Sequence, residues 1–345
     1  MLIISKKWYI IHFDIYFVLF MEMIMMKKIA VLTSGGDTPG MNAAVRSAVR
    51  TAISMGMTVK GVYRGYNGLI DNNFVDLDLR SVSEVINRAG TFLYTARSPR
   101  FREEEGVLEA VENCKKNDIE GVVVIGGDGS FRGARELSMK GIPCVGVPAT
   151  IDNDITSTEY AIGFDTAMNT AVDMIDRLRD TIRSHDRCSA VEVMGRHAGH
   201  LALQVGIATG ATAILIPEIE LNIDDVISKI KQSQKIGKNH FIIVVAEGVA
   251  CGVDEIAKII EEKTGVESRA TVLGHVQRGG NPTVRDRVIA TRMANEAVYL
   301  LSKGIGNRVV AYKGDSIVNY DIFEALNMKK EIDVDVLRVA EEVSI

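Results

Sequence analysis

The stretch VVVIGGDGS, residues Val122–Ser130, joins an apolar run to a glycine-rich turn that carries one carboxylate. A helical pattern follows this turn and extends to about Lys140. A continuous apolar run indicates a strand that is buried on both faces, as strands are in parallel sheets covered by helices. The stretch therefore predicts a strand–turn–helix unit of an α/β fold.

Similar units occur on both sides of this stretch. The apolar run Ile29–Leu32 ends in Ser34-Gly35-Gly36, and a helical pattern follows from about Asn42 to Met55. Further strands are predicted at Val59–Tyr63, Cys144–Val147, Ala190–Met194, Ala213–Ile216, Phe241–Ala246 and Ala270–Leu273. At 345 residues the chain can form two such units. We predict a doubly wound α/β fold whose ligands bind at the carboxyl ends of mostly parallel strands.

The composition is that of an ordinary globular protein, with 47% hydrophobic and 25% charged residues. A formal net charge of -5 gives no electrostatic reason to expect nucleic acid, because proteins that bind it concentrate Lys and Arg on one face. The cysteines are far apart in the sequence and form no C-x-x-C pair. This spacing favours reduced thiols in a cytoplasmic protein over a disulfide framework.

The first residues of the chain differ from the rest. A mostly apolar stretch from Trp8 to Met26 is interrupted by Asp14 and Glu22, which would both be costly inside lipid. The small residues that end a signal peptide are also missing. We expect residues 1–25 to be a dispensable extension, with Met26 as the working start and no membrane partner, a membrane anchor being the alternative.

The turn Thr33–Gly40 (TSGGDTPG) lies between a predicted strand and a predicted helix. Glycines let the backbone approach a phosphate, and a helix start offers free N–H groups and the positive end of its dipole. The turn is not a P-loop, because Met41 and Asn42 stand where that motif has Lys and Ser or Thr. Tight turns also use glycine for structural reasons, so both interpretations stay open for this turn alone.

A second glycine-rich turn, Gly126–Ser130, also follows an apolar run. Its Asp128 can hold Mg²⁺ directly or through water, since this ion takes only one or two carboxylates besides phosphate oxygens and water. An aspartate in such a turn can instead be an ordinary turn residue. Because a glycine-rich turn with an aspartate follows two different predicted strands, a functional interpretation is favoured.

The third candidate is the loop Thr150–Asp154 (TIDND), just beyond a predicted strand. Asp152 and Asp154 can act as a general base and its neighbour, or as metal ligands. The structural alternative is an acidic loop with a helix cap. Basic residues near other strand ends can bind phosphate oxygens if they gather at one site. They are Arg97, Arg187, Arg196, Arg269, His275 and Arg278.

Taken together, these segments resemble the bacterial ATP-dependent 6-phosphofructokinases, and the similarity covers Met26 to the end of the chain. The matching stretches are Lys28–Asn42, Val124–Ser130, Thr150–Ile155, Val191–Arg196 and Arg269–Gly280. The resemblance implies a homotetramer of chains with two Rossmann-like domains and an active site in the cleft between them. The implied domains are residues 26–163 with about 277–327 for ATP, and 164–276 with about 328–345 for fructose 6-phosphate.

The resemblance also implies roles for individual residues. For ATP they are Gly36, Tyr66, Arg97, Ser98, Arg102, Gly127, Asp128, Gly129 and Ser130, with Asp128 organising Mg²⁺. For fructose 6-phosphate they are Thr150, Ile151, Asp152, Asp154, Arg187, Met194, Gly195, Arg196, Glu247, Arg269, His275, Val276, Gln277 and Arg278. Arg187 and Arg269 resemble residues that reach the 6-phosphate from a neighbouring subunit. The catalytic set is Asp152, Arg196, Thr150, Gly36 and Arg97, with Asp152 as the base for the sugar 1-hydroxyl.

The residue types at two positions predict the identity of the phosphoryl donor. Relatives that use pyrophosphate carry Asp where this chain has Gly129 and Lys where it has Ala149, so ATP is expected here. A pyrophosphate-dependent enzyme and a catalytically silent sugar-phosphate sensor are the alternatives. NAD kinases and diacylglycerol kinases share the Gly-Gly-Asp-Gly turn, but they do not explain the Thr150–Asp154 loop or the Arg269–Gly280 stretch.

The bacterial family also has an effector site for ADP and phosphoenolpyruvate. The residues that match its phosphate-binding positions are Arg46, Arg50, Arg179 and Lys238. The departures are Leu79 and Ile236 in place of basic residues and Thr212 in place of a carboxylate. Because each charged hydrogen bond contributes about 1.5–3 kcal/mol, we expect only weak or altered binding of these effectors.

Overall fold

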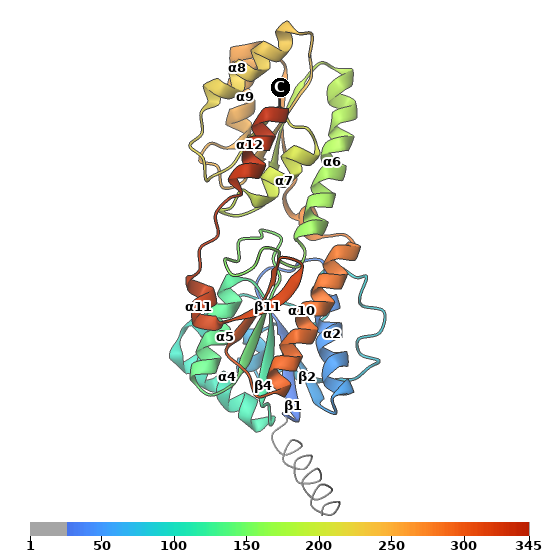
Figure 1. Cartoon of the computed structure of the whole chain (residues 1–345), viewed down its shortest axis with the longest axis vertical. Coiled ribbons are helices and arrows are strands. Elements are labelled where there is room, and N and C mark those ends of the chain that lie inside the picture. The colour runs from blue at the N-terminus through green and yellow to red at the C-terminus, as the bar shows by residue number, and fades with distance from the viewer. Residues whose placement is uncertain (1–25, 345) are drawn as a thin grey trace, which may run out of the picture.

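The computed structural model describes residues 26–344. The prediction for residues 1–25 lies outside the described residues. The chain forms two α/β halves that follow one another along the long axis of the molecule (Figure 1). In this view, α6 to α9 and α12 belong to the upper, smaller half, while α2, α4, α5, α10 and α11 surround the sheet of the lower, larger half.

The larger half contains a seven-stranded sheet in the order β11-β10-β5-β4-β1-β2-β3. The strands pair in parallel except at β2–β3 and β10–β11. The strands are β1 (Lys28–Thr33), β2 (Thr58–Val62), β3 (Phe74–Leu77), β4 (Gly121–Gly126), β5 (Cys144–Pro148), β10 (Arg308–Lys313) and β11 (Ser316–Asp321). The helices are α2 (Met41–Ser54), α3 (Tyr66–Ile70), η1 (Arg100–Arg102), α4 (Glu104–Lys116), α5 (Asp128–Met139), α10 (Val284–Ser302) and α11 (Ile322–Asn327).

The smaller half contains a four-stranded parallel sheet in the order β7-β8-β6-β9. The strands are β6 (Cys188–Val193), β7 (Ala213–Leu215), β8 (Phe241–Ala246) and β9 (Ser268–Val272). The helices are α6 (Phe164–Ser184), α7 (His200–Ala208), α8 (Ile223–Lys235), α9 (Val253–Thr264), η2 (Gly274–Arg278) and α12 (Val334–Val343). Both sheets follow the predicted doubly wound α/β plan, which is confirmed.

Burial on both faces explains the continuous apolar strands. Every residue of β4 and of β8 is buried. On β4, Val123 and Ile125 pack in one apolar cluster while Val122 and Val124 pack in another. Full burial of each such side chain contributes roughly 1.5–3 kcal/mol relative to exposure. The central strands are therefore rigid supports for the loops at their carboxyl ends.

The chain passes between the halves before α6, before α10 and before α12. The first two passages meet at Asp286, whose side chain is fully buried. One carboxylate oxygen accepts the Tyr160 hydroxyl at 2.6 Å and the Gly163 N–H at 2.7 Å, and the other accepts the Thr166 N–H at 2.9 Å. A buried carboxylate needs such partners, so Asp286 fixes the starts of α6 and α10 to each other. The domain boundaries given above stay a prediction.

Most predicted strands agree with the structure to within one or two residues. The strands β3, β10 and β11 were not predicted. Polar residues interrupt β3 and β11, whereas β10 contains a short apolar run at residues 309–312 that was overlooked. The strand predicted at Ala270–Leu273 begins earlier, at Ser268, because the edge strand β9 starts with the polar residues Ser268 and Arg269. None of the helices in residues 26–344 has the length and apolarity that crossing a bilayer requires.

Candidate active site

A cavity of about 1210 Å³ lies between the two halves and is lined by residues of both. Most of the predicted site residues meet there. From the larger half come Gly36, Tyr66, Arg97, Ser98, Arg102, Gly127, Asp128, Gly129, Ser130, Thr150, Asp152 and Asp154, and from the smaller half or its border Arg196, His275 and Arg278. The loops after β1, β4, β5, β6 and β9 thus contribute to one cleft, as expected for the carboxyl ends of parallel strands.

The turn after β1 lies against Arg278. A side-chain β-carbon at Gly36 would come within 2.6 Å of a guanidinium nitrogen of Arg278. The same guanidinium donates to the backbone oxygen of Asp37 at 3.2 Å. The absence of a side chain at position 36 therefore leaves the space in which the Arg278 guanidinium lies across this turn.

The turn after β4 leads directly into α5. A β-carbon added at Gly127 or at Gly129 would meet no atom within 4 Å, so both residues border open space. Asp128, in the first turn of α5, forms an ion pair at 2.8 Å with Arg132, one helical turn later. The free N–H groups of the helix start and Arg132 favour an anionic ligand at this place.

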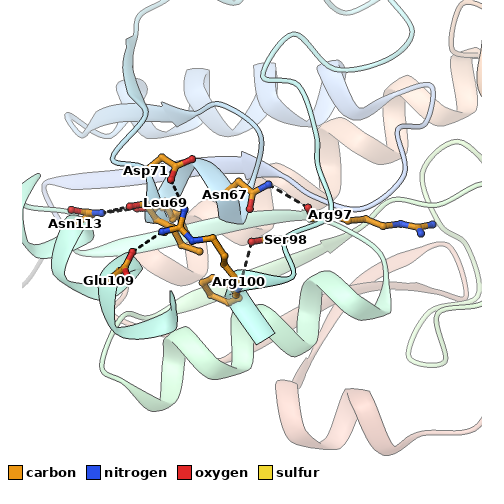
Figure 2. A network of polar contacts seen from close by, with 10 residues as sticks. Asn67, Leu69, Asp71, Arg97, Ser98, Arg100, Glu109 and Asn113 are labelled. Carbon is orange, nitrogen blue, oxygen red and sulfur yellow. Dashed lines mark hydrogen bonds and ion pairs between the residues drawn. The ribbon is translucent and has the colours of Figure 1, made fainter. Parts of the chain in front are cut away.

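The segment that carries Arg97 and Ser98 is irregular but well anchored (Figure 2). The backbone oxygen of Arg97 accepts a hydrogen bond from Asn67 at 3.3 Å, and the Ser98 hydroxyl accepts the Phe101 N–H at 3.3 Å. Next to them, Arg100 pairs with Asp71 and Glu109 at 2.8 and 2.9 Å. Figure 2 shows the Arg97 side chain pointing away from this network, and its residue lines the cleft.

Tyr66 lies beneath the turn after β4. Its hydroxyl donates to the Ser130 backbone oxygen at 2.5 Å, and its ring stacks on Phe101 with the centroids 4.1 Å apart. A β-carbon at Gly133 would come within 2.6 Å of the ring. Burial raises the pKa of Tyr66 well above its ordinary value. The phenol is therefore a neutral structural support for this part of the cleft.

Asp152 has the most unusual surroundings of the cleft. Its residue is only 3% exposed, and its Oδ1 atom is buried without a hydrogen-bond partner. Burial raises the pKa of Asp152, and the charge of Asp154 raises it further, while Arg278 and Arg196 oppose this shift. A raised pKa with one oxygen free of partners is the property of a general base that accepts a proton from a ligand.

Arg196 faces both carboxylates of this loop. Its guanidinium nitrogens lie 4.0 Å from an Asp152 oxygen and 3.9 Å from an Asp154 oxygen. The residue has a positive φ of 58°, a conformation that is uncommon for a side chain larger than glycine. Glu247 stabilises this turn, because one of its oxygens accepts the N–H groups of Gly195 at 3.2 Å and Arg196 at 2.6 Å.

Several other predicted residues lie behind the cleft wall or outside it. Gln277 is fully buried, and its side-chain oxygen accepts the Met194 N–H at 3.3 Å, while Ile151 is part of the core. Val276 is exposed. Arg187 and Arg269 both pair with Glu267 rather than with a cleft residue. Their roles in substrate binding stay a prediction.

The predicted effector residues form two pairs. Arg46 and Arg50 lie one turn apart on α2, where burial and the neighbouring Arg50 lower the pKa of Arg46. Arg179 and Lys238 lie in the smaller half, where burial and the charge of Arg179 lower the pKa of Lys238. Lys238 also approaches the hydroxyl of buried Thr212 at 3.4 Å.

Sequence reasoning missed some residues of the cleft. Arg132 was predictable, since a basic residue four positions after Asp128 on a helix faces the same side. Phe101 gave no signal, because an isolated aromatic residue in an irregular segment has no periodicity. Among residues 26–344, no group of three or more His, Cys, Asp or Glu side chains is arranged to hold a metal ion. Any Mg²⁺ would thus take most of its ligands from a phosphate and water.

Two glycine-rich turns that can bind anions, a carboxylate with one oxygen free of hydrogen-bond partners and facing arginines in one cleft define a phosphotransferase-type site. Residues 28–301 match the family model described as "Phosphofructokinase". The chain is 55% identical to an ATP-dependent 6-phosphofructokinase of Bacillus cereus (strain B4264) and 54% identical to that of Bacillus cytotoxicus, each over 93% of this chain and 100% of the relative. The chain belongs to the phosphofructokinase family.

Solved structures agree with this assignment. The phosphofructokinase of Saccharomyces cerevisiae superposes with a TM-score of 0.83 at 34% identity, over 92% of this chain and 48% of that one. The chain thus spans about half the length of the yeast protein. A pyrophosphate-dependent phosphofructokinase from Marinobacter aquaeolei has a TM-score of 0.81 at 23% identity, over 92% of this chain and 91% of that one, which shows the shared fold alone.

Proposed function

We propose that the chain transfers the γ-phosphoryl group of ATP to the 1-hydroxyl of fructose 6-phosphate, giving fructose 1,6-bisphosphate and ADP. The Bacillus relatives, which the chain matches over their whole length, support this substrate pair. The structural observation that supports it most strongly is the buried, unpaired Oδ1 atom of Asp152 in the cleft. A carboxylate in this state can accept the hydroxyl proton as the sugar oxygen attacks.

The arginines of the cleft supply the second element of the mechanism. Phosphoryl transfer needs little covalent work from a protein, so positioning and charge stabilisation dominate. Arg97 and Arg196, which line the cleft from opposite halves, would offset negative charge on the transferring group. Thr150 helps to orient the base, because its hydroxyl accepts the Asp152 N–H at 3.2 Å. Gly36 keeps the turn after β1 open for Arg278.

Asp128 is the residue that would hold Mg²⁺. Its carboxylate is partly exposed at the cleft and is bound on one side only, by Arg132. One carboxylate beside a phosphate-binding helix start fits the few protein ligands that this ion takes. When bound, the ion would neutralise charge on the phosphates of ATP.

The donor assignment rests on the space near Gly129. No atom lies within 4 Å of a β-carbon added there, so the volume is free for a nucleotide phosphate, and an aspartate would project into it. Ala149 lines the same cleft and is nearly fully buried. A lysine at this position would add a cation close to the place of the transferred group. Both features favour ATP over pyrophosphate.

The decisive experiment measures turnover of the full-length chain with fructose 6-phosphate and Mg-ATP by coupled detection of ADP. A parallel reaction replaces ATP by pyrophosphate and detects fructose 1,6-bisphosphate, because that reaction releases phosphate and no ADP. We expect turnover with ATP alone, on the order of 1–100 per second as is common for kinases. Activity with pyrophosphate alone would contradict the donor assignment. The absence of activity with either donor would instead support a sugar-phosphate sensor.

The oligomeric state, the effectors and the cellular location are further parts of this proposal. We infer a homotetramer in the cytoplasm, where Arg187 and Arg269 reach the 6-phosphate of a neighbouring subunit. Buried thiols fit a reducing compartment, and burial raises the pKa of Cys114 to about 12. ADP and phosphoenolpyruvate would bind weakly, because Leu79 and Ile236 leave exposed apolar side chains where basic ones would help.

A further inference from the structure

The loop that carries Asp152 and Asp154 is held from outside by the last passage between the halves. This passage runs from the end of α11 to the start of α12 (Figure 1). The side-chain ammonium of Lys330, in its middle, donates to the backbone oxygens of Asn153 at 2.7 Å and Thr158 at 2.9 Å. The Thr156 hydroxyl also donates to the backbone oxygen of Ala325 in α11, at 3.1 Å.

Asn153 is the centre of this loop. It lies between the two carboxylates, is 5% exposed and has a positive φ of 51°. Its side-chain nitrogen donates to the backbone oxygen of Glu159 at 3.1 Å, and its side-chain oxygen accepts the Ala161 N–H at 2.9 Å. The backbone of Asn153 sets the directions in which the two neighbouring aspartates leave the chain. Lys330 binds the carbonyl of that backbone.

The surroundings of Lys330 disfavour its charged form. Burial lowers the pKa of Lys330 to about 8, although Asp154 and Glu159 oppose this shift. The same ammonium contributes to a lowered pKa of His200, which burial lowers first. A buried ammonium is stable only when its N–H groups are bound. The two carbonyls of the catalytic loop are the hydrogen-bond partners that hold it there.

We propose that Lys330 is a positioning residue for the phosphoryl transfer: by binding the carbonyls of Asn153 and Thr158, its ammonium holds Asp152 and Asp154 in their productive orientation. The proposal rests on the proposed function, because it assumes that Asp152 is the base. Lys330 does not line the cleft, so it acts through the loop and not on the substrate. It also links the loop to the passage that leads into α12, in the smaller half.

The test compares Lys330→Met, which removes the ammonium at similar size, with Lys330→Gln, which retains N–H donors without the charge. The matched control is Lys329→Met, since Lys329 is the exposed neighbour. We expect kcat of Lys330→Met to fall roughly 10- to 100-fold, because a displacement near 1 Å can cost about that much. The KM for ATP should stay within about twofold, since the substitution does not touch the glycine-rich turns after β1 and β4. Lys330→Gln should show a smaller loss, and Lys330→Arg should restore most of the rate.

The outcomes separate the two proposals. An inactive wild-type chain would reject the proposed function itself. An active wild type, with both Lys330→Met and Lys330→Gln within twofold of Lys329→Met, would reject the positioning role. If Lys330→Met does not fold, Lys330→Gln decides alone by the same criterion. If Lys330→Met impairs kcat and the KM for ATP to the same extent, and Lys330→Arg does not restore them, Lys330 only stabilises the fold. That result would also overturn the proposal.

Discussion

Arg196 in the cleft and Arg50 on α2 carry the same guanidinium group but lie in opposite electrostatic surroundings. Arg196 lies 4.0 and 3.9 Å from two carboxylates of the catalytic loop. Arg50 lies one helical turn from Arg46, and its buried Nε atom has no hydrogen-bond partner. In the cleft, cations face a carboxylate that can take a proton. On α2, a cation faces another cation.

This difference decides which of the two places can support acid–base chemistry. General-base catalysis needs a carboxylate whose pKa is raised yet whose ionised form is still accessible. The cleft meets this need, since burial and Asp154 raise the pKa of Asp152 while the arginines limit the shift. The α2 pair offers no base, although an anion bound there would relieve the repulsion between Arg46 and Arg50.

The largest effect in this comparison is expected for Arg196→Ala. Removing the cation that faces both carboxylates should lower kcat by about 10²- to 10³-fold, as does the loss of one donor that stabilises transition-state charge. Steady-state turnover at saturating Mg-ATP measures it. The control is Arg177→Ala, because Arg177 forms only an exposed pair with Asp173 on α6. A loss of less than about tenfold would mean that Arg196 does not stabilise the transferring group.

A smaller and more specific effect is expected for Asp154→Asn. The base must be ionised, so activity is lost as the pH falls through the pKa of Asp152, which lies above its ordinary value. Because the charge of Asp154 helps to raise that pKa, its removal should move the acidic limb of kcat/KM to lower pH. Arg196→Ala should move the limb in the opposite direction, since Arg196 lowers the pKa. An unmoved limb in both pH–rate profiles would refute this assignment.

The smallest effect is expected for the basic pair on α2. Arg50→Ala should leave kcat within about twofold, because it touches no cleft residue. Saturation curves for fructose 6-phosphate, measured with and without ADP, should differ little even in the wild type. Thr212 lacks the charge to hold an effector's Mg²⁺, and Lys238 is its neighbour. A sigmoidal curve that ADP makes hyperbolic would contradict this expectation.

The parts predicted from the sequence are those with local signals. Buried parallel strands are continuous apolar runs, and the residues with chemistry follow them directly, as Asp128 follows β4 and Asp152 follows β5. The meeting of these residues in one cleft then follows from the geometry of parallel sheets. The edge strand β11 lacks this signal, because polar residues interrupt it and its residues are only partly buried or exposed.

The parts that were missed depend on contacts between distant segments. The hydrogen bond between Lys330 and Asn153 joins residues separated by 177 positions, and that between Tyr160 and Asp286 by 126. The sequence around Lys330 and around Asp286 contains no local pattern that predicts such a partner. Arg97 was a candidate from the sequence, but the conformation of its segment was not predicted, since it depends on side-chain bonds such as that from Asn67.

The most direct test of the account is a single-turnover measurement on Asp152→Asn, together with calorimetric binding of fructose 6-phosphate. Asparagine keeps the size of the side chain but cannot take the proton. We predict a dissociation constant within about threefold of wild type and a transfer rate lower by about 10²- to 10⁴-fold. Transfer within about tenfold of wild type would contradict the role of Asp152 as the base.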